Sequence, residues 1–201
     1  MSASAPLPIV VLLSGSGSNL QAIIDAAQGD LPVEIRAVIS NRADAYGLER
    51  ARQAGIPAIY APKFKEQERR VYDTELAKIV ASYQPDWIVL AGWMRMFSSA
   101  FLERFPGRVV NLHPALPGMF PGMAGIQEAF AAYQRGELTH TGVMVHLVPD
   151  EDMDAGPVLA QEVVPIEPGD TLEALEARVH AVEHRILVDV LKRLTTESRR
   201  T

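Results

Sequence analysis

Short apolar runs alternate with amphipathic segments over the first half of the chain. Each run has the length of a buried strand, and each amphipathic segment spaces its apolar residues three or four apart, as a helix does. The predicted strands are Ile9–Leu13, Val33–Ser40, Ile56–Tyr60, Asp86–Ala91 and Arg108–Leu112, and the predicted helices are Asn19–Ala27, Tyr46–Ala54 and Gln67–Tyr83. This alternation with short turns predicts a doubly wound α/β fold, with a mostly parallel sheet and helices on both faces.

The pattern changes after Pro114. Residues 114–125 hold three prolines and three glycines, which predicts a long loop. A helix is expected next, followed by two strands that alternate like antiparallel partners and are joined by an acidic stretch, and then a closing helix after Gly169-Asp170. The helix is expected at Ile126–Gln134, the two strands at Thr141–Val148 and Pro157–Val164, the acidic stretch at Asp150–Asp154 and the closing helix at Thr171–Leu194. No repeat or linker is evident, so we expect residues 1–201 to form one domain.

Composition narrows the class of protein. The chain has 201 residues, 48% of them apolar, which is enough for a sizeable core. Its net charge of -6 argues against general binding of nucleic acids or anionic membranes. The lack of cysteine excludes disulfides, cysteine-ligated zinc and thiol catalysis. Met1–Pro8 carries no basic residue and Ile9–Leu13 is too short for a signal sequence or a membrane span, so a cytoplasmic location is expected.

The strongest chemical signal lies in the run Val109–Pro114. Alternate residues of a strand point to the same face, so Asn111 and His113 are expected side by side at the end that Pro114 terminates. Open α/β sheets bind ligands at that edge. An amide donor and an imidazole, with Asp154 as a nearby carboxylate, suit a reaction that places negative charge on a carbonyl oxygen. The alternative is a capped strand end with a hydrogen-bonded histidine.

Residues Ser14–Asn19 (Ser-Gly-Ser-Gly-Ser-Asn) connect the first strand to the first helix. Backbone N–H groups and the helix dipole favour an anion at such a place, and glycines let a phosphate approach closely. The third glycine of a dinucleotide fingerprint is absent, as is the lysine of a P-loop. The segment therefore predicts a monophosphate site, with a plain strand-to-helix turn as the alternative.

Three further features need interpretation, and the first two allow two readings each. His180-Ala181-Val182-Glu183-His184 matches a zinc-binding pattern, but no further ligand is evident, and we favour a solvated or substrate-facing helix edge over a metal. Met94–Phe97 could form the wall of a site for a flat heterocycle or could be core residues. His146 lies in an apolar strand, which favours a hydrogen-bonded core histidine.

Together these motifs resemble the phosphoribosylglycinamide formyltransferase family, folate-dependent enzymes of purine synthesis. The resemblance covers nearly the whole chain. It is carried by Val11–Ile23, Ser40–Ala45, Gly47–Ala51, Leu90–Arg95, Asn111–Pro114 and Asp154–Pro157.

The resemblance implies formyl transfer from 10-formyltetrahydrofolate to the amine of glycinamide ribonucleotide, without ATP or metal. Catalysis would rest on Asn111, His113 and Asp154. The ribonucleotide would be bound by Gly17, Ser18, Asn19, His180 and Glu183. The folate would be bound by Arg69, Met94, Arg95, Met96, Phe97, Asn111, Asp150, Glu151, Asp152, Met153 and Asp154.

The chain also departs from the family pattern. Ala115–Gly118 stands where Ser-Leu-Leu-Pro is usual, and the acidic stretch before Asp154 is one residue longer. These differences affect the loop contacts expected for folate, while the three catalytic candidates are retained.

Other functions remain as alternatives. A formyltetrahydrofolate deformylase would carry a regulatory domain before the first strand, where this chain has eight residues, and a methionyl-tRNA formyltransferase would carry a tRNA-binding domain after the last helix. A nucleotide-binding module that uses only Gly17–Asn19 would leave Asn111, His113 and Asp154 unexplained. The sequence leaves the oligomeric state open.

Overall fold

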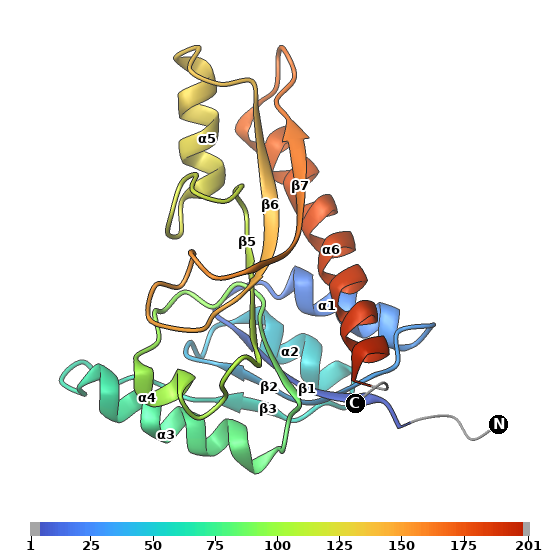
Figure 1. Ribbon diagram of the computed structural model, residues 1–201, viewed down its shortest axis with the longest axis vertical. Helices are drawn as coiled ribbons and strands as arrows, with labels where there is room; N and C mark the ends of the chain where they lie inside the picture. The colour runs from blue at the N-terminus through green and yellow to red at the C-terminus, as the bar shows by residue number, and fades with distance from the viewer. Residues whose placement is uncertain (1–4, 199–201) are drawn as a thin grey trace.

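A computed structural model describes residues 5–198. The expectation of a cytoplasmic location rests partly on Met1–Ser4, which lie outside the described residues. Within residues 5–198, seven strands form one sheet in the order β3-β2-β1-β4-β5-β6-β7 (Figure 1). The elements are β1 (Leu7–Leu13), α1 (Ser18–Ala27), β2 (Val33–Ser40), α2 (Tyr46–Gln53), β3 (Ala58–Tyr60), α3 (Arg69–Ser82), β4 (Trp87–Leu90), α4 (Ser99–Leu102), β5 (Val109–His113), α5 (Gly125–Gln134), β6 (His140–Leu147), β7 (Val158–Pro165) and α6 (Leu172–Glu197).

The sheet changes direction at β5. The strands β1 to β5 pair in parallel, whereas β6 runs antiparallel to β5 and β7 runs antiparallel to β6. The expected mostly parallel sheet with an antiparallel C-terminal part is therefore confirmed. β5 lies between the two parts, with β4 on one side and β6 on the other.

Helices cover both faces of the sheet, as predicted. Along β1, Ile9, Val11 and Leu13 point into one core, and Val10 and Leu12 point into the other; all five are fully buried. The first core includes residues of α1, α2, α5 and α6. The second core includes residues of α3 and α4. This two-sided burial explains why the strand reads as a continuous apolar run.

Several element boundaries differ from the sequence expectation. β3 begins at Ala58 rather than Ile56, and Pro57, which has no backbone N–H to donate to a sheet, lies just before it. α6 begins at Leu172, and Thr171 is its N-cap, with its hydroxyl accepting a hydrogen bond from the Ala174 N–H at 3.3 Å. The four-residue α4 was not predicted.

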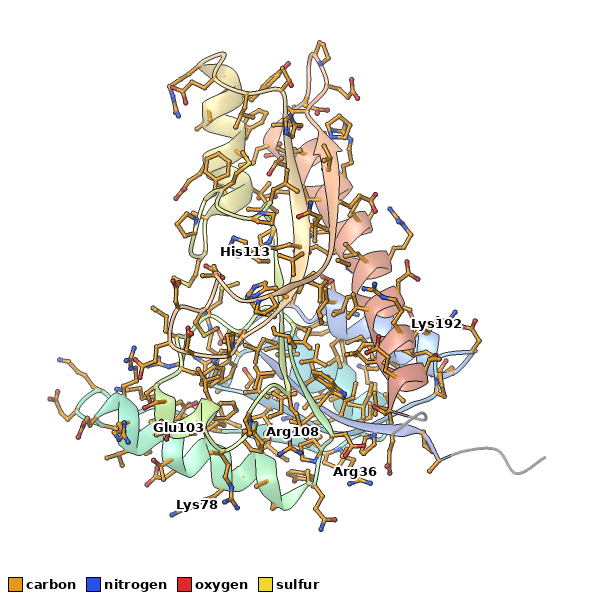
Figure 2. All side chains as sticks on the ribbon, viewed as in Figure 1. Arg36, Lys78, Glu103, Arg108, His113 and Lys192 are labelled. Atoms are coloured by element: carbon orange, nitrogen blue, oxygen red, sulfur yellow. The ribbon has the colours of Figure 1, made fainter. Side chains whose placement is uncertain are left out.

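The parallel strands place several loops at one edge. β1, β4 and β5 end there side by side, and each is followed by a segment that the sequence analysis marked as chemically significant. In Figure 2, β5 rises from Arg108, just before its first residue, to His113 at its last residue near the middle of the molecule. No helix within residues 5–198 is both long and apolar enough to cross a membrane.

Candidate active site

A cavity of about 640 Å³ opens at this edge of the sheet. It is lined by the residues that follow β1 and β4, by the end of β5 and by side chains from α5, α6 and the acidic loop. The lining comprises Ser14–Asn19, Arg42, Ala91–Met96, Asn111–Pro114, Gly122, Met123, Ile126, Gln127, Met153, Asp154, Glu176, His180 and Glu183. The three catalytic candidates therefore share one cavity with the predicted phosphate loop.

Asn111 is held in one orientation by His146. The two residues are opposite each other on β5 and β6, and Asn111 Nδ2 lies 3.1 Å from His146 Nε2. His146 Nδ1 lies 2.9 Å from the carbonyl oxygen of Leu147, so Nδ1 carries the proton. Burial lowers the pKa of His146, which favours the neutral ring, and Nε2 then accepts from the Asn111 amide. The amide nitrogen of Asn111 keeps its second N–H for another acceptor. The expected hydrogen-bonded core histidine at 146 is thus confirmed.

Both ring nitrogens of His113 face oxygen atoms. Nδ1 lies 3.5 Å from Asp154 Oδ1, and Nε2 lies 3.1 Å from the carbonyl oxygen of Phe120. The second oxygen of Asp154 accepts the Gly122 N–H at 3.1 Å. The loop that contains Phe120 and Gly122 therefore contacts both His113 and Asp154. Phe120 has φ of 44°, a backbone conformation that is unfavourable for a residue with a side chain.

The segment after β1 turns sharply at Gly17, which has φ of 72° and caps α1. We expected Gly17 to leave space for a phosphate. The space beside it is instead occupied by backbone, because a Cβ on Gly17 would lie 2.6 Å from Gly47 Cα. Ser14 connects this segment to neighbouring loops. Its hydroxyl donates to Asn41 Oδ1 at 2.6 Å and accepts the Met94 N–H at 2.9 Å.

Glu183, although distant in sequence, lies beside this segment. Its side chain is buried, and Oε2 accepts hydrogen bonds from Asn19 Nδ2 at 3.3 Å and from His180 Nδ1 at 2.7 Å. Asn19 is on α1, while His180 and Glu183 are on α6. The structure thus brings together three of the residues predicted to bind the ribonucleotide.

The two histidines of α6 are expected to titrate on opposite sides of their ordinary pKa of 6.5. The hydrogen bond to Glu183 raises the pKa of His180, whereas burial lowers the pKa of His184. The His180–Glu183 pair therefore stabilises the fold fully below pH 6.5 and loses that contribution as pH rises through the raised value.

NMR titration of the histidine rings measures both values. Glu183→Gln should bring the pKa of His180 down towards 6.5 and change that of His184 less, because burial dominates there. An unchanged His180 titration in this variant would show that the carboxylate is not the cause of its shift.

The residues predicted to bind folate separate into two groups. Met94, Arg95, Met96 and Met153 line the cavity, and Met94 and Met96 are about half exposed. Phe97 does not line it, which corrects the expectation for this residue. It is fully buried between Trp93 and Phe101, with ring centroids 5.8 and 4.1 Å away, so its ring belongs to the second core.

Four further predicted folate contacts also lie outside the cavity lining, namely Arg69, Asp150, Glu151 and Asp152. Arg69 and Glu151 bind each other, with a guanidinium nitrogen 2.7 Å from a carboxylate oxygen, and Glu151 also accepts the Ser99 N–H at 2.8 Å. Asp150 accepts the Asp152 N–H at 3.0 Å. The acidic stretch is therefore tied to α3, to α4 and to itself. Only Met153 and Asp154 from this stretch reach the cavity.

No group of three or more metal-ligating side chains occurs within residues 5–198. In the zinc-like pattern on α6, His180 is bonded to Glu183, and His184 is not part of the cavity lining. The pattern thus contributes two residues to the cavity rather than a ligand set.

Other lining residues were not singled out from the sequence. Met123, Gln127 and Glu176 line the cavity, and the Gln127 amide donates to Glu176 at 2.9 Å across α5 and α6. No local pattern distinguishes Gln127 and Glu176 from ordinary surface residues, because they reach the cavity through the packing of α5 against α6, whereas Met123 reaches it from the loop before α5.

Comparison with known proteins supports one family. Residues 7–191 match the family model described as formyl transferase. The phosphoribosylglycinamide formyltransferase of Schizosaccharomyces pombe is 47% identical, and the match covers 95% of this chain and 98% of that protein. The enzyme of the same name from Escherichia coli is 46% identical, with 89% of this chain and 82% of that protein covered.

Solved structures agree with the sequence matches. The phosphoribosylglycinamide formyltransferase of Coxiella burnetii superposes with a TM-score of 0.87 at 48% identity, covering 96% of this chain and 88% of that chain. Glycinamide ribonucleotide transformylase 1 of Symbiobacterium toebii gives a TM-score of 0.89 at 39% identity, covering 97% and 90%.

Proposed function

Because the chain belongs to the formyl transferase family, and within it to the phosphoribosylglycinamide formyltransferases of purine biosynthesis, we propose that 10-formyltetrahydrofolate is its formyl donor and that Asn111, His113 and Asp154 carry the transfer. One observation supports the proposal most directly. These three residues line the same cavity as the glycine-containing segment after β1. A phosphorylated amine and a formyl donor could therefore meet there.

In the proposed reaction, the amine nitrogen of glycinamide ribonucleotide attacks the formyl carbon. A new C–N bond forms, and the electron pair of the carbonyl bond moves to oxygen. The free N–H of Asn111 and the ring of His113 donate to that oxygen. The intermediate then collapses, the bond from carbon to the folate nitrogen breaks, and the proton lost by the amine is returned to that nitrogen, with Asp154 guiding its path.

This role requires His113 to change its hydrogen-bond partner. When Nδ1 faces Asp154, Nε2 is the nitrogen left to donate, and in the structure it is directed to the carbonyl oxygen of Phe120. We propose that the formyl oxygen replaces this carbonyl as acceptor when the loop moves. The positive φ of Phe120 lowers the cost of such a movement, because leaving that conformation relieves strain.

The substrates would occupy different parts of the lining. The phosphate of the ribonucleotide would bind at Gly17, Ser18 and Asn19, with Glu183 and His180 beside it. The folate would lie against Met94, Arg95, Met96 and Met153. Arg69, Glu151, Asp150 and Asp152 would act indirectly, by holding the loop that presents Asp154. We further propose one domain and no metal requirement.

An assay with both substrates tests the proposal. We expect folate release, followed by absorbance, only when glycinamide ribonucleotide is present, and we expect prolonged chelation to leave the rate intact. Release without the amine would favour a deformylase. Binding of the phosphorylated ligand with no turnover would reduce the chain to a binding module, and activity lost to a chelator and restored by zinc would establish a metal site.

A further inference from the structure

The glycine loop, defined here as Gly15–Gly17 between β1 and α1, directs its three carbonyl groups to fixed donors. The Gly15 carbonyl accepts the Gly47 N–H at 3.1 Å, and the Gly17 carbonyl accepts the Gln21 N–H at 2.9 Å. The Ser16 carbonyl accepts the Arg50 side-chain Nε–H at 2.9 Å. Two of these three donors belong to α2, which has no other assigned part in the cavity.

The N–H groups of the same loop remain available. Within residues 5–198, no hydrogen bond engages the backbone N–H of Gly15, Ser16 or Gly17. The first N–H groups of α1, which follow directly, have no partner inside the helix. With its carbonyl groups bound elsewhere, the loop lines the cavity with free donors, and this arrangement attracts an anion.

Arg50 is the side chain that completes this arrangement. Besides the Ser16 carbonyl, its guanidinium donates to Gln21 Oε1 at 3.1 Å and lies over the Tyr46 ring, 4.9 Å from the centroid. Within the described residues, Arg50 has no acidic partner, so its charge is uncompensated. It does not line the cavity, so it can act on a ligand through the position of the loop and through its charge, but not by direct contact.

The backbones of the loop and α2 are also in close contact. The short approach of Gly17 to Gly47 leaves no space for a Cβ at position 17, and a Cβ at Gly47 would collide with the buried side chain of Leu13. Both glycines are therefore needed for α2 to lie close enough for Arg50 to reach the Ser16 carbonyl. Arg50 therefore donates to the Ser16 carbonyl from a helix whose position beside the loop is set by these close contacts.

We propose that Arg50 is a positioning residue for the phosphate subsite. Its guanidinium holds the Ser16 carbonyl away from the bound phosphate, and its uncompensated charge adds to the attraction for the anion. Without Arg50, the Ser16 peptide can rotate and direct its oxygen towards the phosphate, which repels it. This inference rests on the proposed function in one respect, because it takes the loop to be the phosphate site.

Arg50→Met tests the proposal, since methionine keeps much of the apolar stem and removes the charge and the donors. We expect the KM for glycinamide ribonucleotide and the Kd for ribose 5-phosphate to rise by about 10- to 100-fold, the range for a lost charged hydrogen bond. The kcat and the KM for the folate donor should change little, because the reacting groups are untouched. Calorimetric titration with ribose 5-phosphate, and with ribose alone, isolates the contribution of the phosphate.

Two further variants separate positioning from charge and from folding. Arg50→Lys keeps the charge but cannot reproduce both hydrogen bonds, so an intermediate loss of phosphate affinity is expected. Arg52→Met is the matched control, because Arg52 lies on the same helix, is exposed and binds Glu49. It should leave both constants unchanged. If Arg50→Met does not fold, Arg50→Lys carries the test, and wild-type affinity in that variant overturns the proposal.

Each remaining result has a distinct meaning. Unchanged ribose 5-phosphate binding in Arg50→Met overturns the inference while the proposed function stands. Equal increases in both KM values, or an equal loss in Arg52→Met, also overturn it, because the effect is then structural or generally electrostatic. If the wild-type protein shows no formyl transfer but Arg50→Met still weakens the binding of ribose 5-phosphate, the result supports the inference and contradicts the proposed function. A wild-type protein that binds no ribose 5-phosphate overturns the assigned role of the loop and the inference together.

Discussion

Asp154→Asn is expected to lower kcat by about 10²–10³, the scale for removing one donor to a developing oxyanion. Asp154 Oδ1 lies 3.5 Å from His113 Nδ1, and the second oxygen is bound to the Gly122 N–H. Asparagine keeps the size of the side chain and one oxygen acceptor, but it removes the negative charge beside His113 Nδ1 and one of the two acceptors that face His113 and the Gly122 N–H. His113 then donates less effectively to the oxygen of the intermediate.

Steady-state kinetics and ligand titration should separate this effect from binding. The Kd values for both substrates should move far less than kcat, because the missing interaction belongs to the transition state. Glu103→Gln is a suitable control for the loss of one carboxylate, since Glu103 is exposed and lies far from His113 in Figure 2. A kcat near the wild-type value in Asp154→Asn would eliminate the proposed coupling of the two residues.

Asn111→Asp is expected to lower kcat by at least about 10²–10³. The substitution preserves shape, but it replaces an N–H donor by a carboxylate oxygen beside the oxygen that becomes negative. It also removes the donor to His146 Nε2, which lies 3.1 Å away in a fully buried position. The transition state therefore loses a hydrogen bond and gains a repulsion, while each substrate in its ground state is affected less.

The same exchange at Asn41 provides the control for added charge. Asn41 lies just after β2, and its Oδ1 accepts the Ser14 hydroxyl proton, an interaction that aspartate can also make. Asn41→Asp should reduce kcat much less than Asn111→Asp. Similar losses in the two variants would mean that charge near the cavity, rather than the lost donor, explains the result, and the role given to Asn111 would be abandoned. Thermal melting of each variant excludes unfolding as the cause.

Local patterns in the sequence were sufficient for most of the fold. Buried parallel strands are continuous apolar runs, and amphipathic helices repeat every three to four residues, so both leave a readable signal. Val33–Ser40 was predicted to the residue as β2. α4 was missed because a four-residue helix is too short to show periodicity. The predicted strand 56–60 was too long because its apolar content extends across Pro57.

The site was less predictable because much of it depends on contacts between distant segments. Strand alternation is local, and it correctly placed Asn111 and His113 on one face at the end of β5. The pairing of Asn111 with His146 depends on the register between β5 and β6, which no local pattern specifies. Arg69 and Glu151 were assigned separately to folate, yet they bind each other. Phe97 was grouped with its cavity-lining neighbours, although packing directs its ring into the core.

The place of β5 at the change of strand direction has a consequence for biosynthesis. While the ribosome has delivered only β1 to β5, the parallel sheet in the order β3-β2-β1-β4-β5 ends on β5, and all five residues of this strand are among those buried in the finished protein. Its outer backbone groups find partners only when β6, residues 140–147, has emerged. A nascent chain therefore presents an apolar, unpaired edge, a template for aggregation between copies. The strand that carries Asn111 and His113 is thus also the strand whose outer edge stays unpaired until β6 has been synthesised.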